Sequence, residues 1–329
     1  MVRRRIARTL RSARAALGIN VPVILMYHRI ADESFDPWGL AVTPDRFRRQ
    51  AEWLSRNRLV LPLPDFAHEL QKGRLPARAV AITFDDGYAC NGAMAAPILA
   101  AYNLASTVFL CPELITRGEE CWWDDLERII LSSHSDRLDL DIGNGVQVVQ
   151  LGPRDPGDRV WPTDSPAATA RQKAYLSIWE KLLPLAAGAQ RTVIAQLRDQ
   201  VGISGEPRAS HRLMDEAEIT AAHRLGMAFG GHTLTHAALT ARTDQELASE
   251  IQGSFAWCNM RNGAAPLSFA YPYGLLDDRA VDLAARSGFV CAVTTEQGRV
   301  RKDSSVFRLP RLRTENWTAV KLSRAMSKL

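Results

Sequence analysis

The sequence predicts an α/β fold organised around a parallel sheet, and three features support this prediction. Short, continuous apolar runs such as residues 21–27, 79–82 and 106–110 are typical of strands that are buried on both faces. Helical segments separate these runs at short intervals, which is the alternation of βαβ units. The chain has 329 residues, 46% of them apolar, which is enough for one large α/β barrel with a substantial core.

The first third of the chain follows this alternation. The strand at 21–27 comes first, and Thr43 followed by Pro44 has the residue types of a helix N-cap and first helical position. That helix is expected to run to about residue 57. The next elements are expected to be a strand at 79–82, a helix near 94–102 and a strand at 106–110.

Residues 116–212 interrupt the alternation, and we expect them to form an inserted, mainly helical subdomain. One helix is expected from Trp122 to about residue 131, and another from Ser165 to about residue 185. A third helix is expected at 190–201. Between the first two helices, residues 143–164 are polar and contain glycine and proline, which predicts irregular structure.

The alternation resumes after the insertion. The expected elements are a helix at 215–225 ended by Gly226, a helix at 244–261, a strand at 266–271, a helix at 277–287, strands at 289–293 and 306–309, and a final helix capped by Asn316. The whole chain then has about seven strands. We therefore expect a barrel domain over residues 21–329, interrupted by the insertion and preceded by a basic arm over residues 1–20.

The positive charge of the chain is concentrated in this arm. The net charge is +5, from 41 basic and 36 acidic residues, and six of the basic residues are arginines between Arg3 and Arg14. Without these six the remaining chain is close to neutral, which argues against nucleic-acid binding. The arm is predicted to be a basic helix, either solvated or in peripheral contact with an anionic membrane surface.

Cysteine usage and hydropathy bear on the compartment. The five cysteines are odd in number and have no CxxC spacing, which favours a reducing compartment. No apolar stretch approaches the ~18–20 residues of a membrane span, and the N-terminus lacks the apolar core of a signal peptide. We therefore expect a cytoplasmic protein, with the arm as its contact with the inner membrane face.

Two clusters of ionisable residues follow predicted strands. Asp85 and Asp86 come directly after the strand at 79–82, where a cation or a shared proton would relieve their repulsion, unless they are turn or N-cap residues. His232 and His236 are four residues apart, so both could reach one ion from one face of a helical turn. Two histidines and one aspartate leave one position of a zinc ion open, as in catalytic sites.

Three segments carry a resemblance to a known family. They are TFDDGY at 83–88, HTLTH at 232–236 and FAYPYG at 269–274. In this order they resemble the NodB-homology polysaccharide deacetylases, carbohydrate esterase family 4. The resemblance covers about residues 21–115 and 213–312. It implies a distorted (β/α) barrel of about seven strands, with the active site at the C-terminal ends of the strands.

The resemblance also implies roles for individual residues. Asp86, His232 and His236 would hold Zn²⁺, or Co²⁺ or Ni²⁺ in its place. Asp85 would act as the general base, and the backbone N–H of Tyr273 would stabilise the oxyanion.

The chain departs from the family pattern in two places. Ala270 stands where the third segment usually has an arginine that tunes the catalytic aspartate, and Arg311 is either its substitute or an ordinary surface arginine. No histidine follows His236, although the family usually draws its general acid from a C-terminal histidine. Tyr27-His28 resembles the N-terminal motif of circularly permuted members. His28 is therefore expected to be the acid, unless it only orders the loop after its strand.

These observations lead to one main hypothesis and two alternatives. The main hypothesis is a metal-dependent enzyme that removes the N-acetyl group from amino sugars of a polysaccharide or its glycolipid precursor. One alternative is a deacylase of another amide, such as a formamido sugar or a small acetylated metabolite, and the other is a non-catalytic carbohydrate-binding barrel. Trp122 and Trp123 either pack the insertion onto the barrel or stack on sugar rings.

Overall fold

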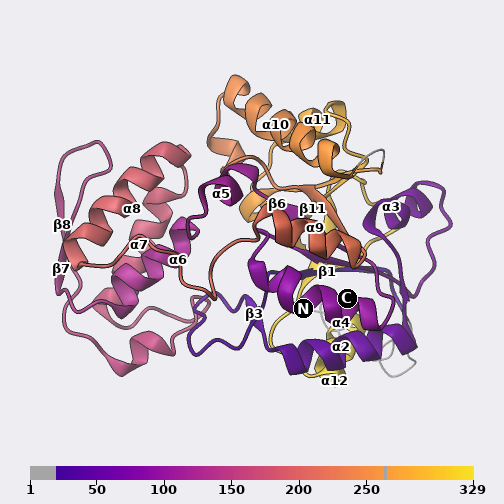
Figure 1. The fold of residues 1–329 in the computed structure, drawn as a ribbon, viewed down its shortest axis with the longest axis horizontal. Helices are drawn as coiled ribbons and strands as arrows, with labels where there is room; N and C mark the ends of the chain where they lie inside the picture. The colour runs from indigo at the N-terminus through magenta and orange to yellow at the C-terminus, as the bar shows by residue number, and fades with distance from the viewer. Residues whose placement is uncertain (1–19, 263–264) are drawn as a thin grey trace, which may run out of the picture.

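Seven parallel strands close into a barrel in the computed structural model, which describes residues 20–262 and 265–329 (Figure 1). Around the ring, each strand pairs with the next and the last returns to the first: β1 (Val23–Tyr27), β12 (Leu309–Arg313), β11 (Cys291–Gln297), β10 (Ser268–Ala270), β9 (Met227–Gly231), β6 (Ser106–Leu110) and β5 (Ala79–Phe84). The short strand β4 (Leu59–Val60) pairs with the start of β5. The predicted distorted (β/α) barrel is confirmed.

The helices predicted outside the insertion are present, with shifts of a few residues. They are α2 (Pro44–Asn57), α4 (Ala96–Ala101), α9 (Glu216–Arg224), α10 (Asp244–Asn262), α11 (Asp278–Arg286) and α12 (Ala319–Ser327). Two further helices are α3 (Leu63–Gln71) and α5 (Pro112–Arg117), and α5 was not predicted. In Figure 1, α10 and α11 lie on one side of the barrel, and α2, α4 and α12 lie on the other. Asp215 caps α9 through a hydrogen bond from the backbone N–H of Glu218.

The core of the barrel follows the alternation of side chains along its strands. Ile24, Ala81, Phe109, Ala270 and Val293 come from five different strands and belong to one buried cluster, which also includes residues of α3. Their neighbours along the strands pack outward against the helices. The barrel is therefore filled by side chains, and polar chemistry is confined to its rim.

The insertion forms a separate lobe beside the barrel (Figure 1). It contains α6 (Trp122–Glu127), a π-helical turn (Arg128–Ser132), α7 (Ala170–Leu182) and α8 (Ala187–Val201), together with the antiparallel hairpin β7 (Arg137–Leu140) and β8 (Gln147–Gln150). This hairpin was not predicted, because its second strand is short and largely exposed and so has no buried apolar face. The buried guanidinium of Arg171 donates to the carbonyls of Ile130, Ser135 and Gly152, and this ties α7 to the rest of the lobe.

Two predicted helix starts were wrong. Helix α7 begins after Thr169 and not after Ser165, because Thr169 and Gln172 form a reciprocal capping box. Helix α12 is capped by Thr318, whereas the side chain of Asn316 accepts a hydrogen bond from the backbone N–H of Thr43.

The last strand was also placed too early by the sequence analysis. It was expected at 306–309, but β12 runs over Leu309–Arg313 and pairs with β1 at Leu312 and Arg313. Strand β12 forms backbone hydrogen bonds with both β1 and β11, and these stabilise it although it has few apolar residues. This register brings Arg311 and Arg313 to the rim.

All five cysteines are free thiols, as predicted. Across the described ranges, every helix is too short or too polar to cross a membrane. The arginines of the basic arm lie outside the described residues, so its contact with a membrane surface stays a prediction.

Candidate metal centre

The two aspartates leave β5 in a tight turn at the C-terminal rim. The backbone N–H of Asp85 donates to the carbonyl of Tyr27 at 3.0 Å, and that of Gly87 donates to the carbonyl of Asp85 at 2.9 Å. Asp86 and Gly87 have φ values of 70° and 79°. A Cβ at Gly87 would lie 2.6 Å from the side chain of Leu110, so only glycine fits there. This turn buries both carboxylates at the rim.

The two histidines follow β9 in a turn and not in a helix. Thr233 and His236 have φ values of 63° and 58°, which is the left-handed region, and the Thr233 hydroxyl accepts from the backbone N–H of Ala237. The expectation of a shared helical face was therefore wrong. Glu250 on α10 fixes the turn by accepting hydrogen bonds from the Leu234 and Thr235 backbone.

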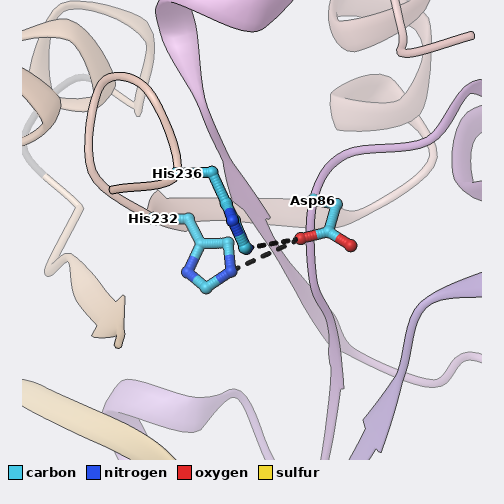
Figure 2. Close-up of side chains that lie close together, drawn as sticks. All are labelled: Asp86, His232 and His236. Carbon is cyan, nitrogen blue, oxygen red and sulfur yellow. Dashed lines mark ion pairs between the residues drawn. The ribbon is translucent and has the colours of Figure 1, made fainter. Parts of the chain in front are cut away.

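The turn nevertheless brings both imidazoles to Asp86 (Figure 2). The Nε2 atoms of His232 and His236 lie 3.5 Å and 3.2 Å from one carboxylate oxygen of Asp86. The three candidate ligand atoms lie within 4.8 Å of one another, and all three residues are buried. The sequence analysis grouped these three residues, and the structure brings them together.

The surroundings of the imidazoles orient them toward a common point. Nδ1 of His232 lies 2.8 Å from the carbonyl oxygen of Ala270, so this nitrogen must donate, and Nε2 is the nitrogen that faces Asp86. The His236 ring packs against the rings of both Trp123 and Tyr273, at centroid distances of 4.5 Å and 4.4 Å.

The electrostatics suit a cation. Burial alone would raise the pKa of Asp86, but hydrogen bonds from His232 and His236 outweigh it and hold the pKa well below its usual range. An ionised carboxylate and two imidazole nitrogens form the donor set of a divalent ion such as Zn²⁺, Co²⁺ or Ni²⁺. These residues therefore fit the metal that the resemblance implies.

Asp85 is held by an arginine from the opposite end of the sequence. The guanidinium of Arg311 donates to both carboxylate oxygens of Asp85 at 2.7 Å and 2.6 Å, and also to the carbonyl of Thr294 at 2.8 Å. Arg311 is fully buried, so the alternative of an ordinary surface arginine was wrong. Burial would raise the pKa of Asp85, but the charge of Arg311 lowers it below its usual value.

His28 follows β1 and faces the same space. Its Nε2 atom lies 3.9 Å from a carboxylate oxygen of Asp85, and its side chain is 16% exposed. Burial lowers the pKa of His28, although Asp86 and Asp85 act in the opposite direction. Among the described residues, His28 is the third histidine of the pocket, beside His232 and His236.

The pocket above these residues is a cavity of about 350 Å³ with aromatic side chains in its wall. Trp123 and Trp179 come from the insertion, and Trp38 comes from the loop after the short strand β2 (Arg29–Ile30). The rings of Trp38 and Trp179 lie 5.0 Å apart between centroids. The insertion therefore forms part of the site, and the sequence analysis missed both Trp38 and Trp179.

The two adjacent tryptophans of the insertion have different surroundings. Trp122 donates its indole N–H to the Tyr273 hydroxyl at 3.1 Å and does not line the pocket. Trp123 donates to the Tyr88 hydroxyl at 3.0 Å, and Tyr88 in turn donates to Asp124 at 2.8 Å. Tyr273, whose φ is 58°, closes this side of the pocket.

A second group of candidate metal ligands lies behind Trp123. Asp124, Glu127 and His211 are buried and close together. The guanidinium of Arg29 already occupies this region, with its Nη1 atom 3.0 Å from Nε2 of His211. Burial and the charge of Arg29 together lower the pKa of His211 to about 2. We interpret this cluster as a structural network whose cation is Arg29.

Comparisons with known proteins agree with this geometry. Residues 72–135 and 197–292 match the polysaccharide deacetylase family, and the unmatched stretch between them lies in the insertion. The curated protein YxkH of Bacillus subtilis (strain 168) is 30% identical to this chain over 126 residues, and it is named as a polysaccharide deacetylase. That region is 36% of this chain and 44% of YxkH, so the match spans less than half of the relative.

Solved structures show the same fold. The Streptococcus pyogenes deacetylase PplD, solved in complex with acetate, superposes with a TM-score of 0.60 at 19% identity, over 94% of this chain and 98% of PplD. BC0361, a polysaccharide deacetylase from Bacillus cereus, superposes with a TM-score of 0.50 at 18% identity, over 93% of this chain and 68% of that one. Residues 72–135 and 197–292 of this chain therefore form a polysaccharide deacetylase domain.

Proposed function

We propose that this protein is a metal-dependent hydrolase that removes the N-acetyl group from amino sugars of a polysaccharide or its glycolipid precursor. The observation that carries the proposal is the convergence of Asp86, His232 and His236 in a pocket that also contains Asp85 and His28. This set has ligands for one ion, a separate carboxylate and a separate histidine. Metal-assisted hydrolysis of an amide can use each of these three elements, as Lewis acid, general base and general acid.

Asp86, His232 and His236 would hold the ion, which when bound supplies a Lewis acid and lowers the pKa of water. Asp85 accepts the proton of the attacking water. Its hydrogen bonds from Arg311 support this role, because they fix the carboxylate plane and favour the ionised form. Arg311 thus takes the part of the arginine that is absent at Ala270.

His28 donates a proton to the leaving amine, which cannot depart as an anion at neutral pH. Its position beside Asp85 supports this role. A histidine whose pKa is lowered by burial is also a strong donor once protonated. The arrangement of Tyr27 and His28 at the first strand resembles the permuted type of the family.

The remaining roles concern binding. The backbone N–H of Tyr273, in its left-handed conformation beside His236, is proposed to donate to the oxyanion. Trp123 and Trp179 line the pocket, and we propose that one of these rings stacks on the sugar.

Metal analysis combined with acetate release tests this proposal. We expect about one divalent ion per chain and release of acetate from N-acetylated oligosaccharides, and Asp85→Asn should keep the ion but lose most turnover. Release of formate from a formamido sugar would favour the other deacylase, and binding of glycans without release would favour the carbohydrate-binding barrel.

A further inference from the structure

Strand β12 carries two arginines toward the rim, and among the described residues only the first of them has a carboxylate partner. Arg311 is buried and paired with Asp85. Arg313 is two residues further along, so it points to the same side of the strand, one layer closer to the rim. It lines the catalytic pocket together with His28 and Trp38.

The contacts of Arg313 orient its charge without neutralising it. Its Nη2 atom donates to the carbonyls of Trp38 and Gly39, and its Nε atom is buried with no hydrogen-bond partner in the described part of the chain. In the same part of the chain, no carboxylate oxygen lies within 4.0 Å of its guanidinium. Gly39 has a φ of 63°, and a Cβ there would lie 3.0 Å from Nη2. The loop is therefore shaped around this guanidinium.

An uncompensated cation in a partly buried pocket is unfavourable in the free protein. The charges around it make the pocket more positive still. The charge of Arg311 cancels that of Asp85, and a divalent ion on Asp86 would exceed the single negative charge of Asp86. The charge of Arg313 would add to this positive excess. Such a pocket attracts anions.

We propose that Arg313 is a specificity residue that recognises an anionic group, a phosphate or a carboxylate, attached to the acetylated sugar. This inference rests on the function proposed above and narrows its substrate class. A second cavity of about 360 Å³ lies beyond Trp38 and Arg313 and contains Glu33, Asp36, Asp164 and Glu315. Because these acids repel anions, the recognised group lies on the catalytic side of Arg313.

Three small substrates separate this idea from its alternatives. They are N-acetylglucosamine 1-phosphate, N-acetylmuramic acid and the neutral methyl glycoside of N-acetylglucosamine. We expect the full-length, metal-loaded protein to prefer one or both anionic sugars over the neutral one. The preferred sugar shows whether the recognised group is a phosphate or a carboxylate. Arg313→Gln should raise KM for the anionic sugar by about 10- to 100-fold, with a change below about 3-fold for the neutral one. Arg313→Lys should retain part of the preference.

The control is Arg301→Gln, which removes the same charge from an exposed position near the opposite end of the barrel. If Arg313 only holds the loop at 38–39, Arg313→Gln will impair all three substrates equally, and that result would overturn the proposal. Equal use of neutral and anionic sugars by the wild type would also overturn it.

If the metal-loaded protein releases acetate from none of the three sugars, that result counts against the proposed function and not against the role of Arg313. Calorimetric binding of the three sugars to chelator-treated protein then still tests Arg313. Tighter binding of an anionic sugar that is lost in Arg313→Gln supports the inference, and no difference refutes it.

Discussion

Removal of the Arg311 guanidinium should destabilise the fold through the carboxylate that it leaves behind. Arg311 is fully buried, and the Asp85 side chain is 4% exposed, so water cannot replace the two hydrogen bonds. Breaking one side of such a pair costs about 3–5 kcal/mol. Since whole domains are stable by about 5–15 kcal/mol, Arg311→Met should still fold but unfold at much lower urea concentration.

A double-mutant cycle isolates the pair. In the Asp85→Asn background no carboxylate is stranded, so the combined loss should be about 2–3 kcal/mol smaller than the sum of the single losses. Urea unfolding followed by tryptophan fluorescence, in the presence of a chelator, measures the stability of all four proteins. Additive losses would show that the two side chains are not coupled.

The pH dependence of stability independently checks whether Arg311 lowers the pKa of Asp85. In the wild type the pKa of Asp85 lies below its usual value, so its stabilising contribution is present above about pH 4 and is lost as the pH falls. In Arg311→Met the strongest charge that lowers this pKa is gone, so we expect burial to raise it. The stability difference between the two proteins should therefore widen from pH 4 to pH 7 and narrow below pH 4.

Four further predictions concern other parts of the molecule. His232→Ala should lose the bound ion as measured by elemental analysis, and full retention would contradict the ligand assignment. His28→Ala should keep the ion but lower amide turnover by about 10²–10⁴-fold, with a smaller loss on an ester, whose alcohol leaves more easily. Burial raises the pKa of Glu127 to about 7, so in the wild type the folded state loses stability as the pH rises from about 4.5 to 7, by at most about 3 kcal/mol. Glu127→Gln should make this loss smaller. Deletion of residues 1–17 should abolish salt-sensitive binding to anionic vesicles, and unchanged binding would exclude a membrane role for the arm.

Much of the barrel was predictable because each buried strand has a local signature. Strands β1, β5 and β6 are continuous apolar runs, and all three were predicted within one or two residues. Strand β12 contains Pro310 and two arginines, so no apolar pattern marks it, and its place was misjudged. The β7–β8 hairpin was missed for a related reason, since it lacks a buried face along its second strand.

The candidate metal ligands were predictable for a topological reason. In a parallel barrel the carboxyl ends of all strands meet at one rim, so residues that directly follow strands converge. Asp86 and His232 satisfy this rule, although the turn that carries His236 is not the helical turn that the spacing suggested. His28 was placed at the rim by the same rule, and it lies beside Asp85.

The sequence by itself determined the α/β class, the strands that end in ionisable residues and the set of candidate ligands, because these depend on local patterns. Only the tertiary structure decided which distant side chains meet. Arg311 pairs with Asp85 across 226 positions of sequence, and Trp38 meets Trp179 of the insertion. Such contacts depend on strand order, register and loop path around the closed barrel, and local residue preferences carry no information about these.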